Sequence, residues 1–574
     1  MGTHIGIQAA TRRTSFRHSI WVATLLSSVC AVAQANPPVH KHYDVPEEAS
    51  KPAASGALAP RLQNVGKHVF PVTCSSEQAK RFMNQGLNLT YGFNHAEAGR
   101  AFAEAARLDP HCAMAYWGQA LVLGPNINAP MDPASEEPAR KFIEQALAMK
   151  NHVSERERAY IDALSVRYTG KAEDRAAADQ AYAGAMRLLH ERYPDDLDAA
   201  TLFAEAMMDL RPWNYWMRDG RPFAGTEEVG KVLDSVVARN PEHPGALHLS
   251  IHLWEAPHPE KAEGAADRLL TLAPAAGHLV HMPGHIYQRV GRYQDAIKAN
   301  QMAIVADEDY ISQCRAQGIY PLGYYPHNIH FLWFGATMAG QSDLAIASAR
   351  KTVSSIPAEA VKEVPILQAF LLVEDFALVR FGKWDEILKL PALKYESLFT
   401  RGVRHYARGM AFTRKNQFDE ARKELAAVKK IAADPALIAT PASMSLNLPD
   451  AVLRIAAESL AGELAAEQGD YPTAIAHLDT AVRMQDALAY TEPDDWHYPA
   501  RHSLGAVLLE AGRAAEAETV YWQDLKEHPK NGWALFGLAQ AMRAQGNIEG
   551  AKAIEADFEK AWAQADIQLA SSRF

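Results

Sequence analysis

The chain has 574 residues, of which 48% are apolar and 22% charged, and its formal net charge is −10. This composition is ordinary for a soluble globular protein and excludes a disordered, collagen-like or multi-span membrane chain, while the length predicts several domains or one extended array. The acidic balance argues against nucleic-acid binding, because that function needs clustered Lys and Arg.

The chain begins with the features of a cleavable signal peptide. Three arginines, the last of them Arg17, precede an uncharged apolar run that ends in the sequence AQA at Ala35. Signal peptidase accepts such a small-x-small ending, and the run is short for a membrane span. We therefore predict a signal peptide over 1–35, export to the periplasm or outside the cell, and no transmembrane span in the mature chain. The arginine pair leaves both twin-arginine and general secretory export open.

A leader follows the signal peptide and holds the first of the three cysteines that would remain after its removal, since the fourth, Cys30, lies within residues 1–35. Its beginning is rich in Pro, Ala and Ser, and we expect a disordered leader over 36–75. Export would leave Cys74, Cys112 and Cys314 in an oxidising compartment, and an odd number predicts one bridge and one free thiol. Cys74 and Cys112 are the favoured pair, because both lie near the starts of neighbouring helical segments.

From about Ser76 onward the chain has an almost continuous helical pattern with a fixed period. Apolar residues recur at i, i+3 and i+4, Gly or Asn separates the segments, and no convincing strand pattern occurs. Gly512 and Gly546 lie 34 residues apart, as do Gly382 and Asn416, and each lies between two expected helices. A period of 34 residues is that of tetratricopeptide (TPR) repeats.

The resemblance to the TPR family holds position by position in several copies. The small and bulky places of the TPR pattern in residues 79–112 are occupied by Gly86, Ala98, Phe102, Ala105 and Pro110. The resemblance implies an all-α fold, a TPR-type helical-hairpin solenoid that forms a right-handed superhelix of about ten hairpins. It also implies that a peptide, protein or small molecule binds in the concave groove. We divide it into N-terminal hairpins over 76–240, His-rich hairpins over 241–360 and C-terminal hairpins over 361–574.

Three stretches are longer than a TPR turn and interrupt the repeats. They are residues 124–131, 211–225 and 319–325, each rich in aromatic residues, Pro or Gly. Solenoids tolerate surface insertions easily, so these stretches could have no function. They could equally fold over the groove and enclose a pocket.

Histidines gather on the expected ligand face of three consecutive hairpins. With Gly291 at the turn of its hairpin, the TPR resemblance assigns the histidines before it to the places that line the concave face. The same phase puts seven histidines on this face: His248, His252, His278, His281, His285, His327 and His330. Near the C-terminus, His502 is a further candidate on the same argument, with Gly512 at the turn, and His497 is a candidate because it lies beside His502 in the sequence.

This pattern favours a metal site. His248/His252 and His281/His285 are i, i+4 pairs, which lie on one helix face and can chelate one ion. Packed helices are about 8–10 Å apart, so imidazoles of adjacent helices can share a centre. Cu, Zn or Fe would suit imidazole ligands. Without a metal, crowded neutral histidines could instead bind an acidic peptide or act as a pH sensor.

Two function classes remain open after this reading. The first is a groove-binding TPR protein with a transition-metal site, which would be metal-dependent if it is an enzyme, with oxidoreductase and hydrolase not resolved. The second is a metal-free TPR adaptor for protein–protein interaction in the cell envelope. The chain has no His-Glu-x-x-His, no Gly-x-Ser-x-Gly and no Gly-rich phosphate loop, so it lacks the usual signatures of metalloproteases, serine hydrolases and nucleotide enzymes.

Overall fold

The computed structural model describes residues 56–314, 320–392, 395–439 and 447–574. Over these ranges the chain is all-α, as predicted, with no strand and only two isolated bridges, Asn126–Ala129 and Trp216–Pro222. None of the described helices combines the length and the apolar character needed to cross a membrane. The expected signal peptide and the leader up to residue 55 lie outside the described residues.

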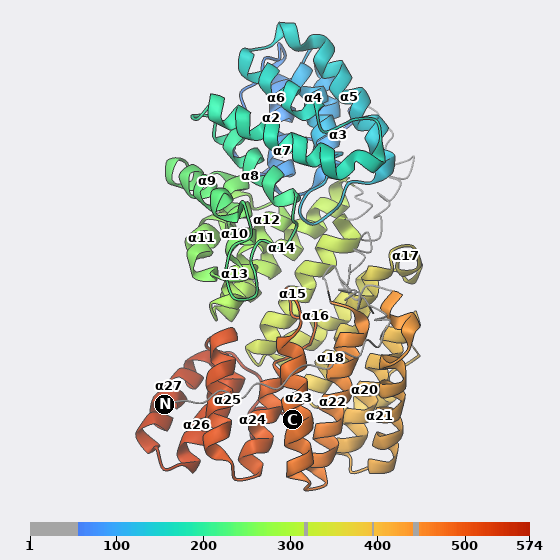
Figure 1. Cartoon of the computed structure of the whole chain (residues 1–574), viewed down its shortest axis with the longest axis vertical. Helices are drawn as coiled ribbons and strands as arrows, with labels where there is room; N and C mark the ends of the chain where they lie inside the picture. Colours follow the sequence, from blue (N-terminus) through green and yellow to red (C-terminus); the bar gives the residue numbers. More distant parts are fainter. Residues whose placement is uncertain (1–55, 315–319, 393–394, 440–446) are drawn as a thin grey trace, which may run out of the picture. The chain divides into compact units, whose positions relative to one another are not determined.

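The N-terminal helices pack as consecutive pairs, α2 with α3, α4 with α5, α6 with α7 and α8 with α9 (Figure 1). Their bounds are α2 (Glu77–Tyr91), α3 (His95–Leu108), α4 (Ala113–Leu121), η1 (Pro133–Ser135), α5 (Glu136–Met149), η2 (Lys150–His152), α6 (Glu155–Ser165), η3 (Ala172–Asp174), α7 (Arg175–Arg192), α8 (Leu197–Asp209) and α9 (Thr226–Arg239). The TPR packing places are used as expected. A Cβ on Gly86 or Gly118 would lie within 2.6 Å of the Phe102 ring, so only glycine admits that ring between the helices.

The middle part of the chain continues the pairing and contains a split helix. Its elements are α10 (Pro244–Trp254), η4 (Pro259–Ala262), α11 (Glu263–Leu272), α12 (Gly277–His281), α13 (Pro283–Arg289), α14 (Tyr293–Cys314), η5 (Tyr320–Tyr324), α15 (Tyr325–Met338) and α16 (Ser342–Ser355). The pattern predicts one helix where α12 and α13 lie. Pro283 has no N–H to donate, and the helix breaks beside it at Met282.

The C-terminal part holds the most regular repeats. Its elements are α17 (Ala358–Glu363), η6 (Pro365–Leu372), α18 (Val373–Arg380), α19 (Trp384–Lys389), α20 (Leu398–Arg414), α21 (Phe418–Ala432), η7 (Pro435–Ala439), α22 (Pro449–Glu467), α23 (Tyr471–Asp486), α24 (Ala500–Glu510), α25 (Ala514–Glu527), α26 (Gly532–Ala544) and α27 (Ile548–Ala561). Gly382, Asn416, Gly512 and Gly546 have positive φ between two helices, which confirms the predicted turns. The described residues contain twelve packed pairs, slightly more than expected.

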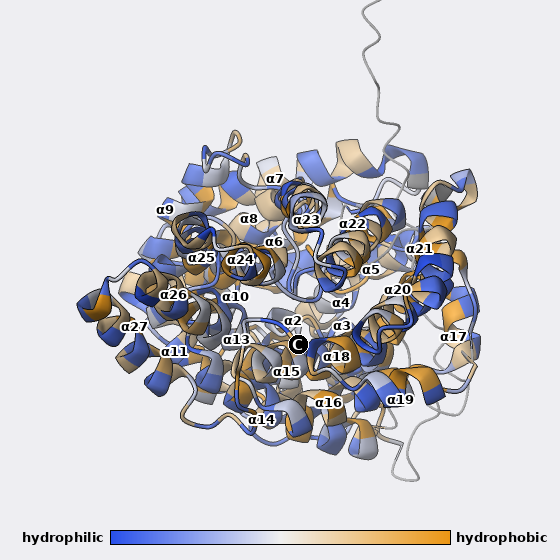
Figure 2. Cartoon of the chain, turned by 90° about the horizontal axis from the view of Figure 1, so that it is seen from below, coloured by the Kyte–Doolittle hydropathy of each residue, from blue (hydrophilic) through white to orange (hydrophobic). Residues whose placement is uncertain are grey.

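Many of the helices are amphipathic, as a stacked array requires, whereas every residue of α10 is buried. In α21, for example, Ala421 and Val428 are buried whereas Lys423 and Lys429 are exposed. Figure 2 shows hydrophilic and hydrophobic residues along the same helices. No pair can bury its apolar face alone, so each depends on its neighbours.

The leader differs from the expectation in its described part. Residues 56–75 form no helix but are packed, with Val65, Phe70 and Cys74 buried. The backbone N–H of Phe70 donates to Asn84 Oδ1 over 2.9 Å. The predicted disulfide between Cys74 and Cys112 is present, and Cys314 is a free, buried thiol. A few buried apolar side chains and a disulfide anchor this segment, so it is ordered although its composition suggests disorder.

Candidate metal centre

Six of the seven predicted histidines come together in two adjacent groups. The first trio consists of His248 and His252 on α10 and His278 on α12; the second trio consists of His281 on α12, His285 on α13 and His327 on α15. Within each trio, one ring nitrogen of each residue lies within 4.8 Å of the others. The trios touch each other, since the ring centroids of His252 and His285 are 5.6 Å apart and those of His278 and His281 are 5.7 Å apart.

His330 does not join either trio. Its ring stacks on Trp333 at a centroid distance of 5.1 Å and an interplanar angle of 7°, and lies 5.7 Å from Phe370. Burial in these apolar surroundings lowers the pKa of His330 to about 3. His330 therefore packs against Trp333 and Phe370 rather than in the second trio, although it lies on α15 with His327.

His502 and His497 are buried in the C-terminal repeats with other partners. His502 Nδ1 accepts a hydrogen bond from Arg380 over 2.8 Å, and its Nε2 donates to Asp524 over 2.9 Å. His497 stacks on Phe376 at 4.2 Å. Neither residue belongs to a group of possible ligands in the described part of the chain, so the structure does not place them in the metal centre.

Two histidines of the cluster have their Nδ1 atoms fixed by neutral oxygens. His248 Nδ1 lies 2.6 Å from the backbone oxygen of Tyr91, at the end of α2. His281 Nδ1 lies 2.7 Å from Asn300 Oδ1. The Asn300 amide donates to the Ala296 carbonyl over 2.8 Å, which fixes its orientation and makes Oδ1 the atom that faces the ring. Both histidines therefore carry their proton on Nδ1 and present the lone pair of Nε2.

Two further ligands share one buried carboxylate. Glu255 Oε1 lies 3.2 Å from His252 Nδ1, and Glu255 Oε2 lies 3.1 Å from His285 Nδ1. Glu492, on the loop before α24, also contacts His285 Nδ1. Carboxylates and carbonyls behind the imidazoles are the arrangement that orients histidine ligands in metal sites.

The Nε2 atoms that remain are buried together. His281 Nε2 and His285 Nε2 are 2.9 Å apart, although both rings have Nδ1 against an acceptor. His248 Nε2 and His252 Nε2 are buried and have no hydrogen-bond partner among the described residues. Two lone pairs that face each other repel, so the approach of His281 and His285 needs either a proton or a metal cation between the two nitrogens.

Burial keeps five of the six imidazoles neutral, those of His248, His252, His278, His281 and His327, and makes the two carboxyls weakly acidic. Burial, together with neighbouring imidazoles, holds the pKa values of His252, His281 and His327 well below the ordinary value. Burial also raises the pKa of Glu255 to about 8 and that of Glu492 well above its usual range. Neutral imidazole is the form that binds metal, and a bound cation would favour the ionised carboxylates.

Aromatic side chains enclose both trios, and two of the inserted stretches contribute to them. The Phe93 ring lies 4.4 Å from that of His248, and the Phe331 ring lies 4.4 Å from that of His285. Trp213, from the stretch 211–225, lies 5.1 Å from His252, and Tyr324, from the stretch 319–325, lies 4.6 Å from His278. These two insertions therefore act as walls of the site.

Sequence reasoning missed the groups that support the ligands. Glu255 follows His252 by three residues on the same helical turn, a spacing that could have identified it. Glu492 and Asn300 come from distant parts of the chain and carry no such signal. The glycine at position 284 is an indirect sign of the close approach of Asn300, because a Cβ on Gly284 would lie 2.7 Å from the Asn300 amide nitrogen.

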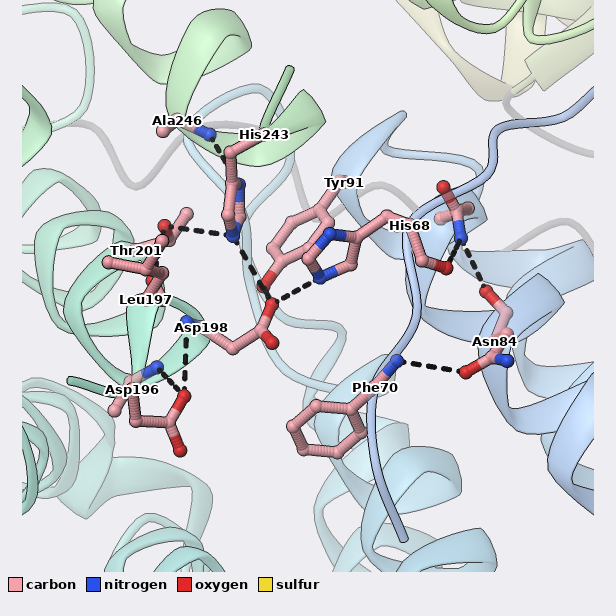
Figure 3. Close-up of polar contacts among 12 residues, drawn as sticks. His68, Phe70, Asn84, Tyr91, Asp196, Leu197, Asp198, Thr201, His243 and Ala246 are labelled. Carbon is pink, nitrogen blue, oxygen red and sulfur yellow. Dashed lines mark hydrogen bonds and ion pairs between the residues drawn. The ribbon is translucent and has the colours of Figure 1, made fainter. Parts of the chain in front are cut away.

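A second group, also missed, connects the N-terminal helices to α10. The Asp198 carboxylate receives hydrogen bonds from His68 Nε2 and Tyr91 Oη, both over 2.7 Å, and lies 3.3 Å from His243 Nε2 (Figure 3). His243 also caps α10, since its Nδ1 accepts from the Ala246 N–H. Because every donor is matched with an acceptor, this group is a structural network that positions Tyr91 and the start of α10.

The comparison with family models agrees with the repeat assignment in the C-terminal part of the chain. Residues 508–556 match the tetratricopeptide repeat family model, and no curated protein matches the chain. Among solved structures, human IFIT1 with m7Gppp-AAAA is similar at 12% identity, over 79% of this chain and 90% of that one, with a TM-score of 0.32. The TPR domain of P58(IPK) is similar at 13% identity, over 82% and 98%, with a TM-score of 0.23. At these scores the likeness carries no argument about ligands.

Proposed function

We propose that the chain is a tetratricopeptide-repeat protein that uses this scaffold to bind transition metal through the histidines of the two trios. The observation that carries the proposal is the 2.9 Å approach of His281 Nε2 and His285 Nε2, with Asn300 and the two glutamates behind the rings. Without a metal, this approach requires a hydrogen bond in which His285 donates from Nε2 while its Nδ1 accepts from a protonated Glu255 or Glu492. A metal ion replaces that hydrogen bond with coordination bonds to both imidazoles.

The donor set indicates which metals fit. All six candidate ligands are imidazoles, and the two carboxylates face Nδ1 atoms. Hard cations such as Mg²⁺ and Ca²⁺ prefer oxygen ligands, whereas imidazole suits Cu, Zn and Fe, among which copper binds most strongly. We propose copper or zinc as the resident metal.

We also propose that the protein acts outside the cytoplasm, after removal of residues 1–35. The Cys74–Cys112 disulfide supports this location, since such bonds persist in oxidising compartments. N-terminal sequencing of the protein from its native cell fraction should start at Asn36. A start at Met1 in the cytoplasmic fraction would contradict export.

The metal proposal is tested by measuring metal content in the purified parent and in the double variant His281→Ala/His285→Ala. His405→Ala serves as the control, because His405 is a partly exposed residue on α20, paired with Glu424. We expect metal in the parent and the control and a sharp loss in the double variant. Added metal should raise the Tm of the first two only, because a bound ion stabilises the folded state. Equal metal content in parent and double variant would refute the site and leave a metal-free adaptor.

A further inference from the structure

We infer that the six imidazoles hold two metal ions as a coupled pair, one in each trio; this inference rests on the proposed metal function. Imidazole nitrogens lie about 2.0–2.1 Å from a bound metal, so two ligands of one ion are at most about 4.2 Å apart. Each trio gathers its three nitrogens within 4.8 Å and fits one ion after small side-chain adjustments.

The cluster is too extended for one ion to use all six rings. Among the ring contacts of the described residues, His248 meets only His252 and His278 from the cluster. His327, at the other end, meets only His281 and His285. The six rings therefore form a series with two compact ends rather than a shell around one centre.

Each end also has its own aromatic wall. Phe93 contacts all three rings of the first trio, at centroid distances of 4.4, 6.1 and 5.7 Å. Phe331 contacts all three rings of the second trio, at 4.5, 4.4 and 4.7 Å. The same construction, three imidazoles against one phenyl ring, thus occurs twice.

Glu255 connects the two ends. Its two oxygens face Nδ1 of His252 in the first trio and Nδ1 of His285 in the second. One carboxylate thereby orients a ligand of each ion. Glu492, with its side chain 2% exposed, adds a second buried carboxyl beside the second trio. Two buried acidic groups suit two adjacent cations better than one, because each cation needs nearby negative charge.

The ligand that such a pair accepts is small. Three imidazoles on each ion leave at least one coordination position open. Five of the six rings are buried, and the aromatic walls lie against them. A species the size of water, hydroxide or dioxygen fits these surroundings, whereas a peptide does not.

The test loads metal-free, full-length protein with copper(II) and compares the number of bound ions with the electron paramagnetic resonance signal. We expect two copper ions per chain and a spin signal well below the copper content, because closely coupled copper(II) ions lose their signal. His248→Gln/His278→Gln and His281→Gln/His327→Gln should each bind one ion with its full signal.

The possible failures are distinguishable. One ion per chain with a full signal would overturn the pair and leave the metal function intact. Two ions with full signals would overturn the coupling and hence the pair. No bound copper, and equally no zinc, would overturn the metal function itself. The wild-type stoichiometry and signal decide these cases even where a variant does not fold.

Discussion

The backbone oxygen of Tyr91 lies 2.6 Å from Nδ1 of His248, and this contact connects the first hairpin to the candidate metal centre. The Tyr91 hydroxyl is bound to Asp198, which His68 and His243 also contact (Figure 3). A ligand on α10 is therefore oriented by a residue of α2, which is in turn held by α8. Gly245 packs closely against the Tyr91 ring, because a Cβ at this position would lie only 2.5 Å from Tyr91 Cδ1.

Removing the Tyr91 hydroxyl should weaken this connection without emptying the site. Tyr91→Phe deletes a 2.7 Å hydrogen bond to a buried carboxylate, and such bonds contribute about 1.5–3 kcal/mol. We expect the free energy of unfolding of the metal-free protein to fall by about that amount in urea titrations. Metal content should stay, because the carbonyl that faces His248 is retained. Tyr116→Phe, which loses only a 3.3 Å contact to Pro110, should change little. Equal urea midpoints for the two variants would contradict the role of Tyr91.

Glu255 offers a direct test of the support behind the ligands. In Glu255→Gln the amide presents an N–H₂ group to one of the two Nδ1–H groups, so either His252 loses its acceptor or His285 retains only Glu492. Changes of this kind lower metal affinity by about 10–100-fold. Competition with a chelator of known affinity measures the change. Glu260→Gln is the matched control, because Glu260 has a 64% exposed side chain beside His258. Unchanged affinity in Glu255→Gln would show that the carboxylate does not act on the metal.

The sequence predicts the location of the cluster because a helical repeat fixes which side chains point inward. Once Gly291 is assigned to a turn, His278, His281 and His285 follow at defined angles, and the structure brings them together. The periodicity does not report what packs opposite each position. It could not separate His327 from His330, since that difference comes from Trp333 and Phe370.

The supporting residues lie beyond a sequence argument for a different reason. Tyr91 and Glu492 reach the cluster from α2 and from the loop before α24, which are far from it in the chain. The division into two trios falls between His278 and His281, which lie on the same short helix α12 but face different histidines, and the periodicity carries no sign of that boundary. Residues 56–75 are ordered because a few side chains, such as that of Phe70, are buried. A prediction from composition averages over the whole segment and therefore misses these few residues.

The C-terminal repeats contain a histidine whose contribution to stability should depend on pH. Burial alone would lower its pKa, but the carboxylates of Asp494 and Asp524 raise the pKa of His528 to about 9. The pKa of His528 is higher in the folded protein than the value of about 6.5 expected in the unfolded chain. Its stabilisation of the fold is therefore complete below about pH 6.5 and is lost as the pH rises through 9. His528→Gln should cost about 3 kcal/mol at pH 6 and little above pH 9.5. Denaturant titrations across this range measure it, and a pH-independent difference would contradict the protonated state.

The assignment of ligands on α15 is tested by two variants three residues apart. His327→Gln removes a ring of the second trio, whereas His330→Gln removes a ring that stacks on Trp333. Loss of a group that supports a ligand lowers metal affinity by about 10–100-fold, and loss of the ligand itself should lower it further. We therefore expect metal affinity to fall more than about 100-fold in His327→Gln. His330→Gln should retain the metal and lose about 1 kcal/mol of stability, because only an aromatic contact is removed. Chelator competition and urea unfolding of both proteins separate the two effects. Metal loss in His330→Gln with retention in His327→Gln would reverse the assignment and require the second trio to be rebuilt around His330.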